Sequence, residues 1–250
     1  MNVSNGTWRA ERPEQDFIQA AKRVGYPEIQ DLTILDANNG ITRALRYIGT
    51  DGKRQDTASR YLRPRLESGN YPNLHVVVNS HVKRVLFVNK RASGVEYIPN
   101  GNTNPSASPR TIGARKLVVL SSGALGTPSI LERSGVGRAE VLKKMGIPVV
   151  ADVPGVGENY QDHHLMTYPY LSNLTERETI DAIVNGQFDV GQLIQTNDPI
   201  LGWNSMDIQA KVRPTDPEVA ELGPEFQNMW NMDYKNVANR PLAIFNLVNA

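Results

Sequence analysis

Two short stretches carry the residue types that could bind a ligand bearing phosphates or a flat ring. The first is Ser121-Ser122-Gly123, which follows the apolar run at residues 117–120. Small residues between a strand and a helix let a ligand approach the backbone closely, and a helix N-terminus favours phosphate. The second stretch, residues 154–163, is a glycine-rich loop whose amide, carboxylate and imidazole groups belong to Asn159, Asp162 and His163.

The elements around Ser121 are predicted from local signals. A strand is expected at residues 115–120, because the apolar run at 117–120 indicates burial. Thr127 can cap the following helix, with Pro128 in its first turn. The helix is expected to end at residues 134–137, where Gly135 and Gly137 tolerate positive φ.

Elsewhere the sequence predicts further helices and strands. Pro13 opens a helix that presents Phe17, Ala20, Ala21 and Val24 and stops at Gly25. Asp56 or Thr57 caps a helix to about Leu66, and Thr175 with Glu178 forms a capping-box signature before Ile180 and Ile183. Further helices are expected at residues 138–145 and 225–234, and strands at 74–78, 81–88, 92–98, 147–150 and 242–248. Residues 100–110 read as a connecting loop.

Composition excludes several functional classes. The chain has 250 residues and a net charge of +1, so nothing in its charge favours nucleic acid or an anionic membrane. Its apolar runs are too short for a membrane helix. There are no cysteines and only four histidines, of which His163 and His164 are adjacent and would point apart on a strand. No metal site is expected.

Three blocks of residues together resemble one known family. Residues 123–137 read Gly-Ala-x-x-Thr-Pro-x-Ile-Leu-x-x-Ser-Gly-Val-Gly. The second block is the loop at residues 154–163, and the third is Arg54-Gln55-Asp56 followed by Tyr71-Pro72-Asn73-Leu74. This pattern resembles the glucose–methanol–choline (GMC) oxidoreductases, which are FAD-dependent enzymes that oxidise alcohols. Looser likenesses at residues 15–17, 168–170 and 211–215 point to the fungal alcohol (methanol) oxidase branch.

The resemblance implies a mixed α/β (α+β) fold that is part of a two-domain flavoprotein with discontinuous domains. Residues 54–165 would form the middle of the FAD-binding domain. Residues 1–53 and 166–250 would belong to the substrate-binding, or cap, domain. The implied FAD-binding residues are Val82, Ser121, Ser122, Gly123, Asn159, Asp162 and His163.

Each implied role has a structural alternative. In family members a valine offers its backbone to the adenine, and the matching Val82 could instead only pack in a strand. Ser121, Ser122 and Gly123 would lie beside the ribose and phosphates, or could form a plain turn. Asn159, Asp162 and His163 would hold a loop over the flavin, although His163 could equally make a local structural hydrogen bond.

The family's chemistry also needs groups that this sequence does not contain. It has no G-x-G-x-x-G turn to seat the FAD pyrophosphate, and no histidine at the position of the family's catalytic base. No catalytic residue is therefore assigned. We expect an internal fragment, inactive by itself, of an oxidase that converts a short primary alcohol to the aldehyde with oxygen.

Two alternatives remain open, and some properties follow only from the resemblance. The chain could derive from an aryl-alcohol, glucose or choline type of GMC enzyme, or from a scaffold that kept the fold without the chemistry. The expected partners are an alcohol and oxygen, in a parent enzyme that is a homo-oligomer. The expected location is intracellular and peroxisomal.

Overall fold

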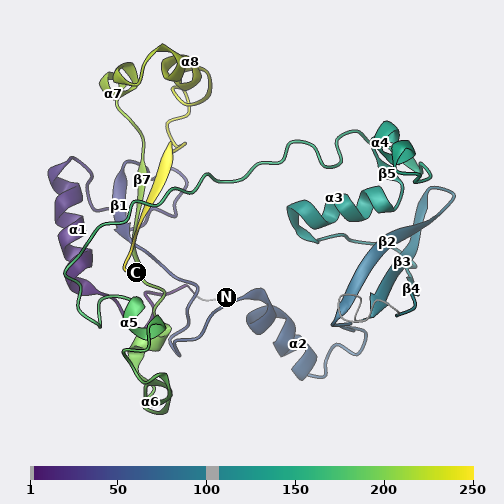
Figure 1. Ribbon diagram of the computed structural model, residues 1–250, viewed down its shortest axis with the longest axis horizontal. Helices are drawn as coiled ribbons and strands as arrows, with labels where there is room; N and C mark the ends of the chain where they lie inside the picture. Colours follow the sequence, from purple (N-terminus) through teal and green to yellow (C-terminus); the bar gives the residue numbers. More distant parts are fainter. Residues whose placement is uncertain (1–2, 100–106) are drawn as a thin grey trace. The chain divides into compact units, whose positions relative to one another are not determined.

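The computed structural model describes residues 3–99 and 107–250 (Figure 1). The chain forms two compact units. The first runs from the N-terminus to Pro72 and from Tyr170 to Ala250, and the second covers Asn73–Pro169. The family resemblance implies a different division, at residues 53/54 and 165/166, into an FAD-binding part and substrate-binding parts. That division stays a prediction. Part of the loop predicted at 100–110 lies outside the described residues.

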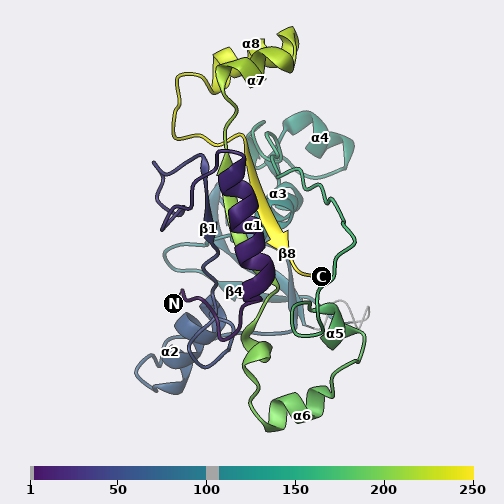
Figure 2. The ribbon, with the colours of Figure 1, turned by 90° about the vertical axis from the view of Figure 1, so that its left-hand side faces the viewer.

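The first unit is built on a three-stranded antiparallel sheet of order β1-β7-β8. Helix α1 lies along one face of it (Figure 2). Its elements are α1 (Glu11–Arg23), β1 (Gly40–Arg43), η1 (Ala58–Leu62), α2 (Arg63–Glu67), α5 (Asp181–Val184), α6 (Val190–Gln195), η2 (Pro199–Gly202), β7 (Met206–Val212), α7 (Asp216–Glu221), α8 (Pro224–Asp233) and β8 (Ala243–Val248).

Helix α1 is held to the sheet by an aliphatic cluster. Ile18 packs with Ile41 of β1 and Ile208 of β7, and all three are fully buried. The predicted helix is confirmed. Of its predicted apolar positions Ala21 packs against this cluster, but Phe17 and Val24 are 37% and 73% exposed, so the predicted face is wrong at those two residues. The helix turns Ile18 inward instead, because Glu14, one turn earlier, is buried in ion pairs and lies on the same face.

Helices α7 and α8 form an excursion between β7 and β8. Phe226, Trp230 and Tyr234 stack along α8. The Arg213 guanidinium lies 4.3 Å from the centre of the Trp230 ring. It also donates to the carbonyl oxygens of Val237 (3.1 Å), Arg240 (2.9 Å), Lys235 (3.3 Å) and Tyr234. One side chain thus closes the base of the excursion. The predicted helix at 225–234 and strand at 242–248 are confirmed as α8 and β8.

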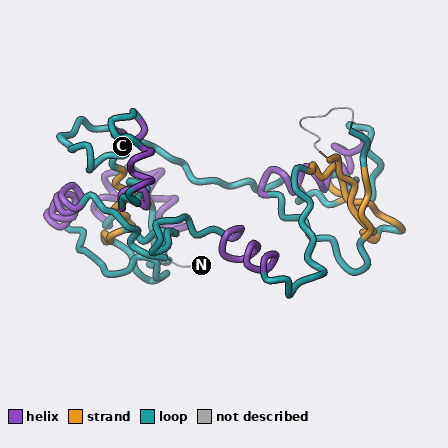
Figure 3. Tube along the Cα trace, turned by 90° about the horizontal axis from the view of Figure 1, so that it is seen from below, coloured by secondary structure: helices purple, strands orange, loops and turns teal. Residues whose placement is uncertain are grey.

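The second unit combines an antiparallel sheet of order β2-β3-β4 with a small parallel pair, β5-β6. Figure 3 shows its strands in orange. Its elements are β2 (Ser80–Val88), β3 (Arg91–Pro99), β4 (Arg110–Gly113), α3 (Gly123–Arg133), β5 (Val136–Gly137), α4 (Ala139–Lys144) and β6 (Ala151–Asp152). The predicted strands at 81–88 and 92–98 are confirmed as a hairpin, whose turn residues Asn89 and Lys90 both have positive φ.

Helix α3 is clamped to the free edge of β2 at its C-terminal end. The Ser134 hydroxyl accepts the Val85 N–H at 2.8 Å and donates to the Ile130 carbonyl. Arg133 Nε donates to the Lys83 carbonyl at 2.9 Å. These contacts occupy backbone groups of β2 that no strand pairs with among the described residues.

Three predicted strands are wrong. Residues 74–78 and 117–120 have no regular secondary structure, residues 115–116 form a bend, and within residues 3–99 and 107–250 none of them has a ladder partner. The expected burial of residues 117–120 fails as well, with Leu117 75% exposed. Apolar runs of this kind suit a parallel sheet covered on both faces, and the described residues supply no such sheet around them. Residues 147–150 lie just before the short strand β6 and are not part of it.

Two helix starts also differ from the prediction. Helix α3 begins at Gly123, so Thr127 and Pro128 lie inside it, and the Thr127 hydroxyl accepts the Ser122 N–H at 2.9 Å. Thr175 and Glu178 do bond at 2.9 Å, but α5 starts only at Asp181. The predicted cap at Asp56 is confirmed by its 2.6 Å bond from the Ser59 N–H.

The mixed arrangement of helices and strands confirms the predicted α/β (α+β mixed) class. Helix α4 and its stop at Gly146 are confirmed as well, as is the end of α3 at residues 134–137.

We predict that Gly135→Ala destabilises the second unit by about 3 kcal/mol. Gly135 has φ +84°, and an added Cβ would lie 2.3 Å from the Pro148 carbonyl oxygen. Left-handed backbone costs a non-glycine residue about 1–2 kcal/mol, and the clash adds to it. The control is Gly146→Ala, with φ +68° and nothing within 4 Å of the added Cβ. Urea unfolding of both variants checks this, and equal losses would disprove the steric contribution.

Candidate functional site

Ser121, Ser122 and Gly123 lie exposed at the entrance to α3. Gly123 has φ +81°, and a Cβ added to it would have no heavy atom within 4 Å. Neither serine hydroxyl bonds another group in the described part of the chain. The site therefore offers small side chains, two hydroxyls and the first N–H groups of an 11-residue helix. This donor set fits an anionic or hydroxylated ligand such as the phosphates and ribose of a dinucleotide.

Val82 lies on β2, opposite Tyr97 of β3. The pairing register shifts between Val82 and Arg84, so a β-bulge follows directly after Val82. Bulges re-aim the backbone and are common beside binding sites. Because the C-terminal end of α3 is clamped to β2, the structure places Val82 and the residues at 121–123 on two elements that pack together. The backbone contact of Val82 with adenine stays a prediction.

The loop at residues 154–163 reaches α3 at one point. A Cβ added to Gly157 would lie 3.8 Å from the Pro128 Cβ. Beyond this point the polar groups bond mainly to one another. Asn159 Oδ1 accepts from Gln161 Nε2 at 2.9 Å, and Asp162 Oδ1 accepts the His163 N–H at 2.8 Å.

Asp162 is the most strongly held group in this loop. The bond from the His163 backbone N–H, together with one from the Tyr160 hydroxyl at 3.1 Å, lowers the pKa of its carboxyl group. The structure does not join Asn159, Asp162 or His163 to residues 121–123 by any hydrogen bond between described residues. Their proposed role over a flavin stays a prediction.

The described residues contain neither a metal-binding cluster nor a helix that could span a membrane. In that part of the chain no cluster of three His, Cys, Asp or Glu side chains could hold a metal ion. No helix of residues 3–99 and 107–250 is long and apolar enough to cross a bilayer.

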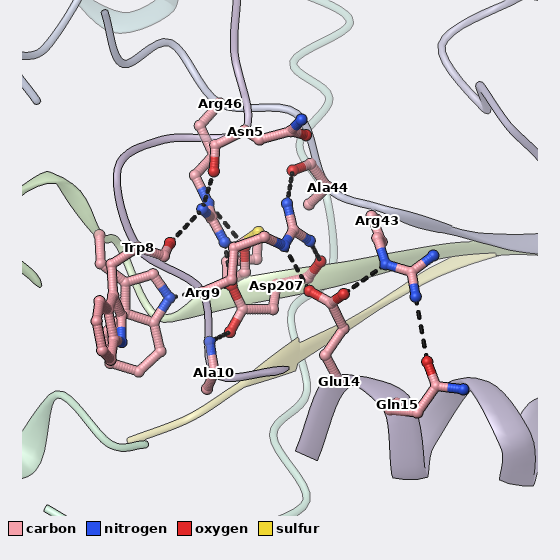
Figure 4. Close-up of polar contacts among 12 residues, drawn as sticks. Asn5, Trp8, Arg9, Ala10, Glu14, Gln15, Arg43, Ala44, Arg46 and Asp207 are labelled. Atoms are coloured by element: carbon pink, nitrogen blue, oxygen red, sulfur yellow. Dashed lines mark hydrogen bonds and ion pairs between the residues drawn. The ribbon is translucent and has the colours of Figure 1, made fainter. Parts of the chain in front are cut away.

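A dense polar cluster of the first unit was not predicted (Figure 4). Its centre is Asp207 of β7, whose carboxylate is fully buried. It accepts from the Ala10 N–H (3.2 Å), Trp203 Nε1 (3.0 Å), Asn249 Nδ2 (3.1 Å) and the guanidinium of Arg46. Four chain segments therefore meet at one carboxylate.

Arg46 is equally well satisfied. Its side chain is 1% exposed and also donates to the carbonyl oxygens of Asn5, Trp8 and Met206. Burial lowers the pKa of Arg46, while the charge of Asp207 opposes that shift. Since an arginine stays protonated in proteins, the pair is ionic.

Two further arginines border this cluster. Arg9 and Arg43 each bond one oxygen of the buried Glu14 carboxylate, both at 2.5 Å. Arg9 also donates to the backbone carbonyls of Ala44 and Asp207. Because every charge here has partners, the cluster stabilises the fold and leaves no free group for chemistry.

Glu178 forms a comparable but more exposed ion pair. It accepts a bidentate bond from Arg12, at 2.8 and 2.6 Å, and another bond from the Thr175 N–H. The bond from Arg12, followed by the one from Thr175, lowers the pKa of Glu178 to about 2.

One surface hollow of about 1020 Å³ lies on the first unit, and its lining includes none of the residues implied in FAD binding. Its charged lining is internally paired. Glu28 bonds Lys22 at 2.8 Å and also pairs with Arg43. We therefore do not assign it a ligand.

The comparisons with known proteins decide the family. Residues 1–165 match the GMC oxidoreductase family. The chain belongs to this family. It is 32% identical over 241 residues to the alcohol oxidase of Candida boidinii and 31% identical over 244 residues to that of Pichia angusta. Each alignment covers 94% of this chain but 36% of the relative, so the chain spans about a third of the length of these relatives.

Other members match over part of the chain or by fold. An oxygen-dependent choline dehydrogenase of Cronobacter sakazakii is 42% identical over 154 residues, which is 62% of this chain and 26% of that protein. An FAD-dependent oxidoreductase from Chaetomium thermophilum superposes with a TM-score of 0.77 at 23% identity, over 100% of this chain and 47% of its own. A formate oxidase superposes with a TM-score of 0.75 at 19% identity, over 99% of this chain and 42% of its own. The family match confirms the resemblance drawn from sequence and supports FAD as the family's cofactor.

We predict that Asp207→Asn destabilises the first unit by about 3–5 kcal/mol, because it leaves the Arg46 charge buried without a partner. The matched control is Glu96→Gln, which breaks the more exposed Arg84–Glu96 pair of the second unit. It should cost at most about 1 kcal/mol. Denaturant unfolding monitored by far-UV circular dichroism measures both, because all three tryptophans lie in the first unit. A loss below about 1 kcal/mol for Asp207→Asn would show that the cluster is not a major source of stability.

Proposed function

We propose that this chain is part of an FAD-dependent alcohol oxidase that converts a short primary alcohol, such as methanol, to its aldehyde. The observation that carries the proposal is the identity to two alcohol oxidases over 94% of the chain. Bound FAD supplies the hydride acceptor, and oxygen reoxidises it. The substrate partners are then the alcohol and oxygen, and the parent enzyme is a homo-oligomer of the peroxisome.

The residues at the entrance to α3 form one wall of the proposed cofactor site. Ser121, Ser122 and the first N–H groups of α3 bind ribose and phosphate oxygens, and Gly123 lets the ligand lie against the backbone. Val82 offers its main-chain groups to the adenine. Asn159, Asp162 and His163 hold the loop that covers the flavin. The exposure of residues 121–123 and the open space above Gly123 support this assignment.

The rest of the site comes from polypeptide outside this sequence. A G-x-G-x-x-G turn for the pyrophosphate and a histidine base with an asparagine or second histidine are not among its 250 residues. The unpaired runs at 74–78 and 117–120 support the same conclusion, because each leads directly into an implied FAD-binding element. The role of this chain is thus to position cofactor and substrate, and residues 1–53 and 166–250 contribute to the substrate side.

A choline-oxidising enzyme of the same family is the second candidate. The 42% identity to a choline dehydrogenase over 154 residues favours it. The alcohol oxidases match over more of the chain, which is why a simple alcohol is the first choice.

Sequencing the coding region on both sides of this segment, followed by expression of the whole protein, tests the proposal. We expect a G-x-G-x-x-G turn before it, a histidine base after it, and hydrogen peroxide production with methanol or ethanol. Turnover of choline alone would favour the second candidate. No oxidation of methanol, ethanol, benzyl alcohol or choline by a flavin-loaded protein would refute both.

We predict that the 250-residue chain by itself binds FAD weakly or not at all and has no turnover. It contains one wall of the site, while the pyrophosphate turn and the base are absent from its sequence. Equilibrium dialysis against FAD and a peroxide-coupled assay with methanol are the measurements. Retention of stoichiometric FAD through gel filtration would contradict the prediction.

We predict that Gly123→Ala in the longer flavoprotein lowers FAD affinity at least tenfold, because the added methyl group occupies the space left for the ligand. Gly146→Ala is the control, since it has a similar φ and the same empty surroundings in this chain but lies outside the implied site. Both variants carry a similar backbone strain. FAD occupancy is read from the ratio of flavin to protein absorbance. Equal occupancy in the two variants would remove Gly123 from the site.

A further inference from the structure

Methionine is the only sulfur-containing residue that this chain offers to an oxidant, because its sequence has no cysteine. Peroxides convert the methionine thioether to a sulfoxide, which is a polar group. Three methionines of the described residues are more than half exposed, namely Met145 at 68%, Met166 at 71% and Met232 at 78%. Exposure alone therefore does not distinguish one of them.

Met166 differs from the other two in its surroundings. The Tyr168 hydroxyl donates to its sulfur at 3.9 Å, whereas no hydrogen bond reaches the sulfur of Met145 or Met232 within the described residues. The segment around Met166 is also open, since the backbone of residues 164–172 forms no hydrogen bond in the part of the chain that the structure describes. Nothing in this segment holds the sulfur away from a small oxidant.

The Tyr168 hydroxyl gives this sulfur a hydrogen-bond donor that is useful in oxidation. When the sulfur lone pair attacks one oxygen of hydrogen peroxide, an S=O bond forms and the O–O bond breaks. The other oxygen leaves as water with both peroxide protons, so the sulfur is oxidised by two electrons and the peroxide is reduced. A hydroxyl beside the sulfur can hydrogen-bond the leaving oxygen and afterwards the sulfoxide oxygen, which is a stronger acceptor than a thioether sulfur.

We propose that Met166 is a methionine-oxidation site, which takes an oxygen atom from the hydrogen peroxide that the oxidase reaction forms. This inference rests on the proposed function, in which oxygen reoxidises the flavin and the loop with His163 covers it. Met166 lies three residues after His163, so it is the exposed methionine closest to this loop along the chain. The sulfoxide then adds a polar group directly beside the covering loop.

Peptide mass spectrometry of the longer flavoprotein tests the proposal. The enzyme oxidises methanol with catalase in solution, so that only peroxide which has not yet left the site can react. A second sample receives added peroxide without alcohol or catalase. We expect the ratio of sulfoxide at Met166 to sulfoxide at Met145 to be about fivefold higher during turnover than with added peroxide. The same ratio in the two samples overturns the proposal.

A peroxide-coupled assay of the same protein separates this inference from the function on which it rests. Peroxide production with an unchanged sulfoxide ratio would overturn the role of Met166 and leave the proposed function in place. Absence of peroxide with every alcohol tested would overturn the proposed function, and the inference would fall with it.

The substitution Tyr168→Phe tests the neighbouring hydroxyl in the 250-residue chain with added hydrogen peroxide. Loss of the hydroxyl should slow oxidation of Met166 about threefold, because the leaving oxygen loses its donor. Oxidation of Met145 in the same sample is the internal control and should be unchanged. An unchanged rate at Met166 would make it no more reactive than any exposed methionine, and would count against the site.

Discussion

The buried carboxylate of Asp207 is the constraint on which the first unit depends. A charge removed from water costs several kcal/mol unless it is paired and hydrogen-bonded, and here four donors satisfy it. The donors come from residues 10, 46, 203 and 249, so the carboxylate can be satisfied only when these distant segments meet. This requirement joins the N-terminal segment, the end of β1 and the C-terminal residues to β7. A hydrophobic cluster could bring the same elements together, but it would specify their arrangement less sharply.

The second unit is held together differently, because side chains of α3 bond backbone groups at the edge of its sheet. Ser134 and Arg133 of α3 bind the Val85 N–H and the Lys83 carbonyl on the free edge of β2. The helix thereby protects the strand, while Gly123 at its other end stays exposed.

Sequence predicted best where a local signal decides the structure. The glycine after α1 and the Asp56 cap act within a few residues, and both formed as predicted. The family motif at residues 123–137 identified the family because its residue types are fixed over fifteen positions.

Prediction failed where a distant partner decides. Strand β7 was not predicted, although its residues alternate between apolar and polar as in a half-buried strand. What that pattern does not give is the burial of Asp207, which depends on donors such as Arg46 far along the chain. The burial of Glu14 on α1 likewise depends on a distant residue, Arg43. Residues 74–78 and 117–120 have strand composition, but composition cannot supply the neighbouring strand that a ladder requires. The ligand roles expected for Val82, Asn159, Asp162 and His163 stay predictions.

The contacts of Arg213 have a consequence for how this family can vary. One guanidinium binds the carbonyls that end α8 and stacks on Trp230, so the two ends of the excursion are joined where β7 stops and β8 begins. What lies above that junction does not carry the register of the sheet. Residues 214–223 hold none of the partners of Arg213, so they can be lengthened, shortened or exchanged during evolution or by an engineer while the strands below keep their pairing. In modular terms, Arg213 makes the α7 segment a replaceable cassette.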